Sequence, residues 1–394
     1  MATDVKTGAL TINGKSVIHY IIVAFFCLGF RYIPGFAGIT PMGMGILGCF
    51  IGAIYGWSTL DMIWPSIMGM MGMGFIVGFN PMASATFGNY IVVCMLFAFP
   101  ALGIMTSTGA MDYLVNKALT NKFTLGKPWM TVTVLLMACL LLATLNSIII
   151  CIIFCTFFKN ILEQIGAEKY SKLATFLYLG IAVACSLGQV MIPFMGQALA
   201  LVGAYNAMFN ESFNFALYFL ISIPMSIIMM LFFVFIMRFV FRVDVSPLKN
   251  MTADMLGESQ KCTKDQKKAM ICFLLWMVVI LCSCLKFLGP LYRIFGFFGI
   301  TGIAMLLVIC TMLIKKEDGT PLLDFREAAK HMSWDALLLT SFVLLMSTYM
   351  SLPDAGISAA LAKALQPFTK FSPMVFVILA LSFTAIVTNF ANNM

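Results

Sequence analysis

The sequence predicts an all-α, polytopic membrane protein with inverted repeats, re-entrant helical hairpins and broken helices. Of its 394 residues, 61% are hydrophobic and 10% are charged, and the mean hydropathy is +1.00. A soluble domain carries about 25% charged residues, and no water-soluble fold of this length could bury so much apolar surface. Apolar segments close to the length that spans a bilayer core recur from Val17 to the last residue.

Polar breaks between the apolar segments predict the helices in order. The expected segments are 17–33, 38–56, 61–79, 88–119 with a bend near Thr106–Gly109, 129–158, 171–206 with a break around Gly188–Gly196, 212–241, 268–287, 297–314, 334–365 and 372–394. The polar loop 243–267 separates an N-terminal half, 1–242, from an incomplete second half, 268–394. The Gly/Met-rich run 68–75 favours close approach between helices.

The segment 129–158 is longer than one span and short for two. The polar cluster Thr144-Leu145-Asn146-Ser147 interrupts it in the middle. This pattern predicts a re-entrant hairpin of two half-helices, whose tip stops near the bilayer midplane. Non-helical backbone is tolerated at that depth only where it is buried in protein or lines a cavity.

The distribution of Lys and Arg supports a hairpin that enters and leaves from the cytoplasm. That topology puts 19 of the 24 basic residues inside and five outside, the five being Arg31, Lys286, Arg293, Lys363 and Lys370. An ordinary span would separate Lys122 and Lys127 from Lys159, Lys169 and Lys172 and would invert everything downstream. We therefore expect a multi-pass protein of the cell membrane with a cytoplasmic N-terminus. The net charge of +8 then needs no nucleic acid as a partner.

An internal repeat relates the two halves. Gly109 precedes Asn146 by 37 positions, and Gly356 precedes Asn393 by the same interval. The predicted topology places the first Asn cluster in an inward hairpin and the second in an outward one, as in the inverted repeats of secondary transporters. Since the second repeat has no counterpart of the segment that follows Ser147, we expect a natural protein of roughly 490 residues.

Asn at a hairpin tip offers a carbonyl oxygen to a cation and an amide to an anion, and half-helix ends add further ligands for ions. The alternative for these Asn residues is that they only join helices. The break around Gly188–Gly196 predicts an unwound helix that faces the hairpin, and its alternative is a simple Pro kink at Pro193. The candidate substrate- and ion-binding residues are Thr144, Asn146, Ser147, Ser186, Gly188, Gly196, Thr388, Asn389, Asn392 and Asn393.

Enzyme chemistry has little support in the sequence. It contains no GxSxG, HExxH or Walker A motif and no paired intramembrane acids. The 12 Cys lie mostly inside apolar segments, as small buried hydrophobes do. With two His, a His-based metal site is disfavoured, and we expect no cofactor other than a coupling ion.

The pattern resembles the divalent-anion/sodium symporters of the ion transporter superfamily, which carry citrate, dicarboxylates or sulfate. Leu145-Asn146-Ser147 and Asn392-Asn393-Met394 stand where that family has a Ser-Asn-Thr motif at each of two opposed hairpins. The run 333–339 is similar to the family's helix entry before the second motif, and 179–188 resembles the helix after the first. The resemblance implies a homodimer, an elevator-type cycle, and Na⁺ beside each hairpin, here at Asn146, Thr388 and Asn393.

The leading hypothesis is therefore a Na⁺-coupled symporter of small anions such as di- or tricarboxylates or sulfate. Leu145 replaces the first hydroxyl of the motif, and Leu141 stands where a hydroxyl residue is usual. A proton-coupled permease for another small metabolite is therefore an alternative. A membrane-embedded enzyme or sensor without transport is the alternative from another class.

Overall fold

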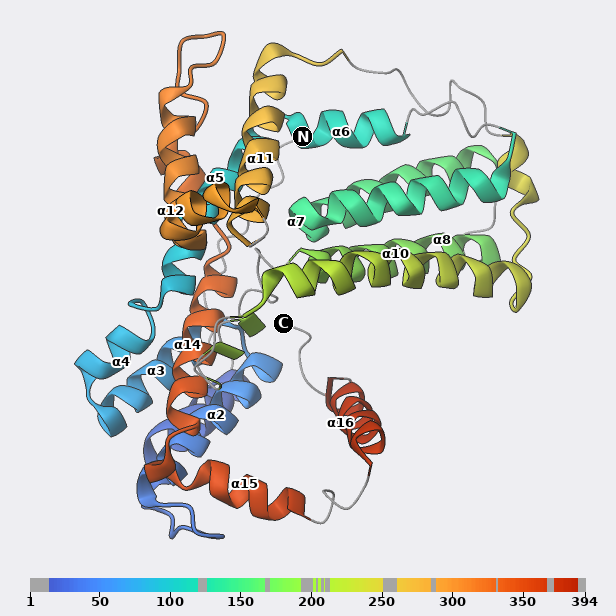
Figure 1. Ribbon diagram of the computed structural model, residues 1–394. Helices are drawn as coiled ribbons and strands as arrows, with labels where there is room; N and C mark the ends of the chain where they lie inside the picture. Colours follow the sequence, from blue (N-terminus) through green and yellow to red (C-terminus); the bar gives the residue numbers. More distant parts are fainter. Residues whose placement is uncertain are drawn as a thin grey trace. The chain divides into compact units, whose positions relative to one another are not determined.

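The computed structural model confirms an all-α polytopic membrane protein (Figure 1). It describes residues 14–119, 126–166, 171–192, 201–202, 205–206, 209, 213–250, 261–284, 288–330, 332–366 and 372–388. Within these ranges the chain forms helices and loops and no strand, with one isolated β-bridge between Lys315 and Pro321.

Seven helices of the described chain are long and apolar enough to cross a bilayer. They are α2 (Pro41–Thr59), α5 (Tyr90–Ser107), α7 (Pro128–Gln164), α8 (Lys172–Met191), α10 (Phe215–Phe239), α11 (Lys264–Cys284) and α12 (Pro290–Leu313). The shorter elements are α1 (Gly14–Ala24), η1 (Phe25–Gly29), η2 (Phe30–Tyr32), α3 (Ile63–Val77), α4 (Phe79–Ala85), α6 (Ala110–Leu119), η4 (Ser246–Asn250), α13 (Phe325–Lys330), α14 (Trp334–Met350), η7 (Pro353–Ala355), α15 (Ile357–Leu365) and α16 (Pro373–Thr388).

The chain folds into two compact units. The first comprises Met1–Val92, Gly203–Glu211 and Trp334–Met394, and the second comprises Val93–Val202 and Ser212–Ser333. Each unit joins segments that lie far apart in the sequence. The units therefore do not coincide with the sequence halves 1–242 and 268–394, because packing and not chain order defines them.

The first unit is built on close contacts between α2, α3, α14 and the segment α1–η1. A Cβ at Gly69 would lie 2.4 Å from the Phe342 ring, and one at Gly72 would lie 2.6 Å from the Cys27 carbonyl oxygen. These glycines belong to the run 68–75, so the close helix approach expected there is present. The same approach places the Trp57 and Phe342 rings edge to face, 5.8 Å apart.

The second unit has its core between α7, α8 and α10. The buried side chains of α7 come from both sides of its midpoint, for example Leu136 and Leu140 before it and Phe154 and Phe158 after it. A second layer contains α11 and α12, and the Gln266 side chain of α11 donates to the carbonyl of Gly109. Gly109 adopts a positive φ of 67°, which favours glycine at the start of α6.

Two stretches of the chain share an order of elements. α5 leads through Gly109 into the short α6, and α14 leads through η7 and Gly356, with φ 70°, into the short α15. The next long helix begins in each case with a proline, Pro128 in α7 and Pro373 in α16. In both stretches a glycine with positive φ precedes the short helix, and a proline begins the long helix that follows.

Two irregular turns have no counterpart in the sequence prediction. Residues Phe25–Gly29 form a π-turn, where the Cys49 thiol donates to the Cys27 carbonyl at 3.4 Å. In α12, Gly299 leaves helical geometry with φ 59° and ψ −179°. Helix α12 therefore begins at Pro290 and is broken, whereas hydropathy predicts a helix over 297–314. Hydropathy, which predicts only the length of an apolar segment, gives no signal for either turn.

Candidate functional site

The site is built on a reversal of the chain inside α7. Asn146 has extended backbone angles, φ −161° and ψ 101°, between the limbs 128–145 and 147–164. The Cys185 thiol of α8 lies 3.8 Å from that of Cys139 and also interacts with that of Cys151. On one straight helix Cys139 and Cys151 would lie about 18 Å apart. The two limbs therefore fold back on each other beside α8 and α10 (Figure 1).

Asn146 caps the second limb. The backbone N–H of Ile149 donates to Asn146 Oδ1 at 3.1 Å, which is the usual bond of an Asn at a helix N-cap. The amide nitrogen of Asn146 makes no hydrogen bond with the described residues, and the side chain is exposed. Asn146 therefore presents amide N–H donors, while its side-chain oxygen accepts the capping bond from Ile149.

Polar and small residues of α8 meet the tip of the hairpin. Gln189 Nε2 donates to Ser147 Oγ at 2.6 Å. One residue earlier, a Cβ at Gly188 would lie 2.7 Å from both Ala143 Cβ and the Leu140 carbonyl oxygen. Glycine is required there because α8 approaches the first limb too closely for a side chain. Gly188 and Ser147 were both expected at the site, and the structure joins them through Gln189.

Two hydroxyls of α10 complete this end of the second unit. Tyr218 donates to the Val190 carbonyl, and Ser222 donates to the Met191 carbonyl at 2.9 Å. These carbonyls belong to the last turn of α8, which has no helical donors for them. The α8 end, the α10 start and the hairpin tip thus form one polar cluster in an apolar helix layer.

Helix ends of opposite polarity meet at the tip. The first limb ends with carbonyls at Leu142–Leu145, which favour a cation, and the second begins with the N–H groups of Ser147 and Ile148, which favour an anion. With the Asn146 amide added, the second limb begins with a group of N–H donors, a chemistry that suits an anion.

The remaining predicted residues contribute less or lie outside the description. Thr144 donates its hydroxyl to the Leu141 carbonyl within its own limb at 2.6 Å. The Ser186 hydroxyl is exposed and makes no hydrogen bond within the described ranges. Thr388 is the last residue of α16, and its side chain is not described. Gly196, Asn389, Asn392 and Asn393 lie outside the described residues.

Sequence reasoning missed Gln189, Tyr218 and Ser222. A usable signal existed for Gln189, because an intramembrane polar residue beside a glycine marks a functional or packing site. Tyr218 and Ser222 carry no such signal. Their role follows from where α8 ends.

Among the described residues, no group of three or more His, Cys, Asp or Glu side chains could hold a metal ion.

Comparison with known proteins adds the family. Residues 47–394 match the model of the CitMHS family, described as citrate transporter. The chain belongs to the CitMHS family. It is part of the ion transporter superfamily, which includes the divalent-anion/sodium symporters that the sequence resembles. No curated protein matches the chain.

CitMHS membership identifies the chain as a secondary transporter of the citrate/anion class, with a small-molecule substrate and the lipid bilayer as its surroundings. This confirms the transporter prediction at that level and favours it over an enzyme or a sensor.

Proposed function

We propose that the protein is a symporter of small di- or tricarboxylates, with citrate the first substrate to test and sulfate a smaller candidate of the same charge class. The observation that carries the proposal is the α7 tip, where the Asn146 amide, which makes no hydrogen bond with the described residues, lies beside the first N–H groups of the second limb. These are donors suited to carboxylate oxygens. The family match supports the same substrate class.

The length of the second limb supports a tip within the bilayer. From Asn146 to Lys159, the first charged residue of that limb, the helix rises about 20 Å. With Lys159 at one membrane surface, the tip lies inside a hydrocarbon core about 30 Å thick. A tip at this depth agrees with the substrate sites of secondary transporters, which lie near the bilayer midplane.

The second half of the site is proposed from the repeat. α16 corresponds to the first limb of α7, so Thr388, Asn389, Asn392 and Asn393 would form an opposed tip that faces the other side of the membrane. We propose that the two tips enclose the anion, that the protein is a homodimer with an elevator-type cycle, and that its N-terminus is cytoplasmic in the cell membrane.

Sodium is the proposed coupling ion, bound near Asn146, Thr388 and Asn393. Its support is the set of carbonyls at the end of the first limb. Proton coupling is the second candidate, because Asn146 Oδ1 accepts from Ile149 and the Thr144 hydroxyl donates within its own limb. Uptake driven by a Na⁺ gradient at constant pH, against uptake driven by a pH gradient without Na⁺, decides between the two.

The binding proposal is tested by replacing Asn146 in the full chain and measuring citrate uptake in proteoliposomes. Asn146→Ser keeps an N-cap oxygen but removes the amide donors. We expect thermal stability close to that of the unmodified protein and uptake reduced at least tenfold, since a hydrogen bond to a charged ligand contributes about 1.5–3 kcal/mol. Unchanged citrate uptake by this variant would remove the tip from the binding site.

A matched control separates capping from binding. Ser171 caps α8 at the opposite end of the same helix layer, where Ala174 N–H donates to its Oγ at 3.2 Å. Ser171→Ala should lower stability by about 1 kcal/mol and leave the KM for citrate unchanged. If Ser171→Ala reduces uptake as much as Asn146→Ser does, the loss reflects the fold and not the ligand.

A further inference from the structure

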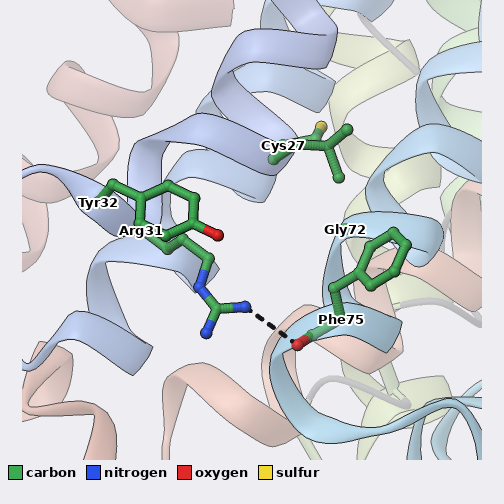
Figure 2. Close-up of a pocket in the computed structure, with 6 residues that line it drawn as sticks. Cys27, Arg31, Tyr32, Gly72 and Phe75 are labelled. Carbon is green, nitrogen blue, oxygen red and sulfur yellow. Dashed lines mark hydrogen bonds between the residues drawn. The ribbon is translucent and has the colours of Figure 1, made fainter.

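A cavity in the first unit lies apart from the α7 tip. It has a volume of about 170 Å³ and lies between the segment η1–η2 and helix α3. Its lining residues are Cys27, Leu28, Arg31, Tyr32, Gly72 and Phe75. Figure 2 shows the Arg31 side chain reaching from η2 toward Phe75, with the Tyr32 ring beside it. The cavity therefore combines apolar walls with one cation.

Arg31 has spare hydrogen-bonding capacity. Its Nη1 donates to the Phe75 carbonyl at 3.1 Å, which caps the last turn of α3. The guanidinium also lies 5.6 Å from the centre of the Tyr32 ring. A guanidinium has five N–H donors, and none of the ion pairs in the described chain includes Arg31. Most of its donors are therefore left for an anionic ligand.

Arg31 lies where several helices begin or end, which is the level expected for a membrane surface. Segment η2 ends at Tyr32, α2 begins at Pro41 and α3 ends at Val77. All three meet at one end of the unit, because a Cβ at Gly45 would lie 3.1 Å from Arg31 Cβ and 2.8 Å from Ile76. Arg side chains near helix ends reach the headgroup layer in this way.

The rim of the cavity is apolar and exposed. The exposed fractions are 79% for Tyr32, 54% for Phe75 and 39% for Leu28. An exposed apolar rim of this kind suits contact with lipid acyl chains. The volume of about 170 Å³ is below the roughly 300–1,000 Å³ of ordinary small-molecule pockets. It suits the first part of a lipid better than a complete hydrophilic solute.

We propose that this cavity is a binding site for an anionic phospholipid, with the phosphodiester on Arg31 and the start of an acyl chain between Leu28 and Phe75. Arg binds phosphate oxygens through parallel N–H bonds. The unpaired positive charge selects an anionic headgroup over a zwitterionic one, which carries its own cation. This site is separate from the proposed transport function and does not depend on it.

The experiment is a lipid titration of the purified full chain in detergent, with bound lipid counted by native mass spectrometry. The probes are phosphatidylglycerol, phosphatidylcholine and inorganic phosphate. The unmodified protein should bind phosphatidylglycerol more tightly than phosphatidylcholine, and inorganic phosphate should not displace the lipid. Displacement by inorganic phosphate, or equal binding of the two lipids, would contradict the proposal.

Variants assign the binding to this cavity. Arg31→Gln should weaken phosphatidylglycerol binding about fivefold, the usual contribution of one basic residue at a membrane surface. Arg293→Gln, at another exposed arginine, is the matched control and should leave binding unchanged. Equal affinity of Arg31→Gln and the unmodified protein overturns the site.

A second pair of variants guards against loss of the fold. Arg31→Lys keeps a cation that can donate to Phe75, and it should retain most of the preference for phosphatidylglycerol. Leu28→Trp leaves Arg31 and its bond to α3 in place but fills the groove, and it should weaken binding as much as Arg31→Gln. Unaltered lipid binding by Leu28→Trp would exclude the acyl-chain groove.

Discussion

The two polar atoms of the Asn146 side chain have different surroundings. Its oxygen caps the second limb of α7, and its amide nitrogen is left at the tip. Ser or Asp could cap the helix equally well, yet neither offers an amide donor. The next residue, Ser147, is fixed in turn by Gln189 from α8. The tip is therefore held by one local bond within α7 and one bond from the neighbouring helix α8.

At the residue scale, the Gln189–Ser147 bond is tested by a double-mutant cycle. Gln189→Leu and Ser147→Ala each remove the same bond of 2.6 Å. Each should raise the KM for citrate uptake about fivefold, because a net hydrogen bond contributes about 1 kcal/mol. The double variant should be no worse than either single variant. Independent, multiplying effects would mean that Gln189 does not act through Ser147.

Helices α7 and α8 act as one element in the second unit. Gly180 and Gly188 of α8 both lie against the first limb, near Leu136 and Ala143. Since a Cβ at Gly188 would meet a backbone carbonyl, the contact cannot be relieved by turning a flexible side chain. The spacing between α8 and the tip thus depends on the absence of a methyl group.

The element-scale prediction compares two glycines in helices of the second unit. Gly188→Ala should lower the unfolding free energy by about 1–3 kcal/mol, the usual cost of overpacking. At Gly103 in α5, a Cβ would meet only Ala328 Cβ at 3.6 Å. Gly103→Ala should therefore be neutral or raise stability by about 0.5–1 kcal/mol. Thermal unfolding in detergent measures both, and equal effects would show that close packing at Gly188 is unimportant.

Hydropathy predicts most helices of the described chain because the bilayer demands long apolar segments, and it places the polar break of α7 at the residue where the backbone turns. It does not predict Gln189 as the partner of Ser147, since that contact joins positions 42 residues apart. Hydropathy also gives no signal for the π-turn at Phe25–Gly29 or for the break at Gly299. The sequence therefore predicts where the tip is, and packing determines which side chains surround it.

At the scale of the whole molecule, the packing of α7 brings both of its ends to one end of the helix layer. Trp129 at the start of α7 contacts Phe176 near the start of α8, and Arg238 near the end of α10 lies over the Trp129 ring. Basic residues flank this end at Lys127, Lys159 and Lys172. This clustering of basic residues agrees with the proposed cytoplasmic side of the hairpin.

Insertion of a reporter that fluoresces only when folded in the cytoplasm tests the proposed topology. Gly126, Gly166 and Gly289 lie in turns with open space around them. Insertions at Gly126 and Gly166 should both fluoresce, because the hairpin returns to the side it left. An insertion at Gly289 should be dark. Fluorescence at only one of Gly126 and Gly166 would mean that α7 crosses the membrane once.

The π-turn at Phe25–Gly29 has a consequence for the angular position of everything that follows it. A π-turn holds one residue more than an α-helical turn, and one residue corresponds to about 100° around a helix axis. The extra residue in this turn therefore sets the direction in which Arg31 points, toward α3. Removing one residue from Phe25–Gly29 should rotate the guanidinium away from Phe75 and leave the Phe75 carbonyl without its bond to Arg31. The length of this turn, more than the identity of any residue in it, determines which neighbour Arg31 meets.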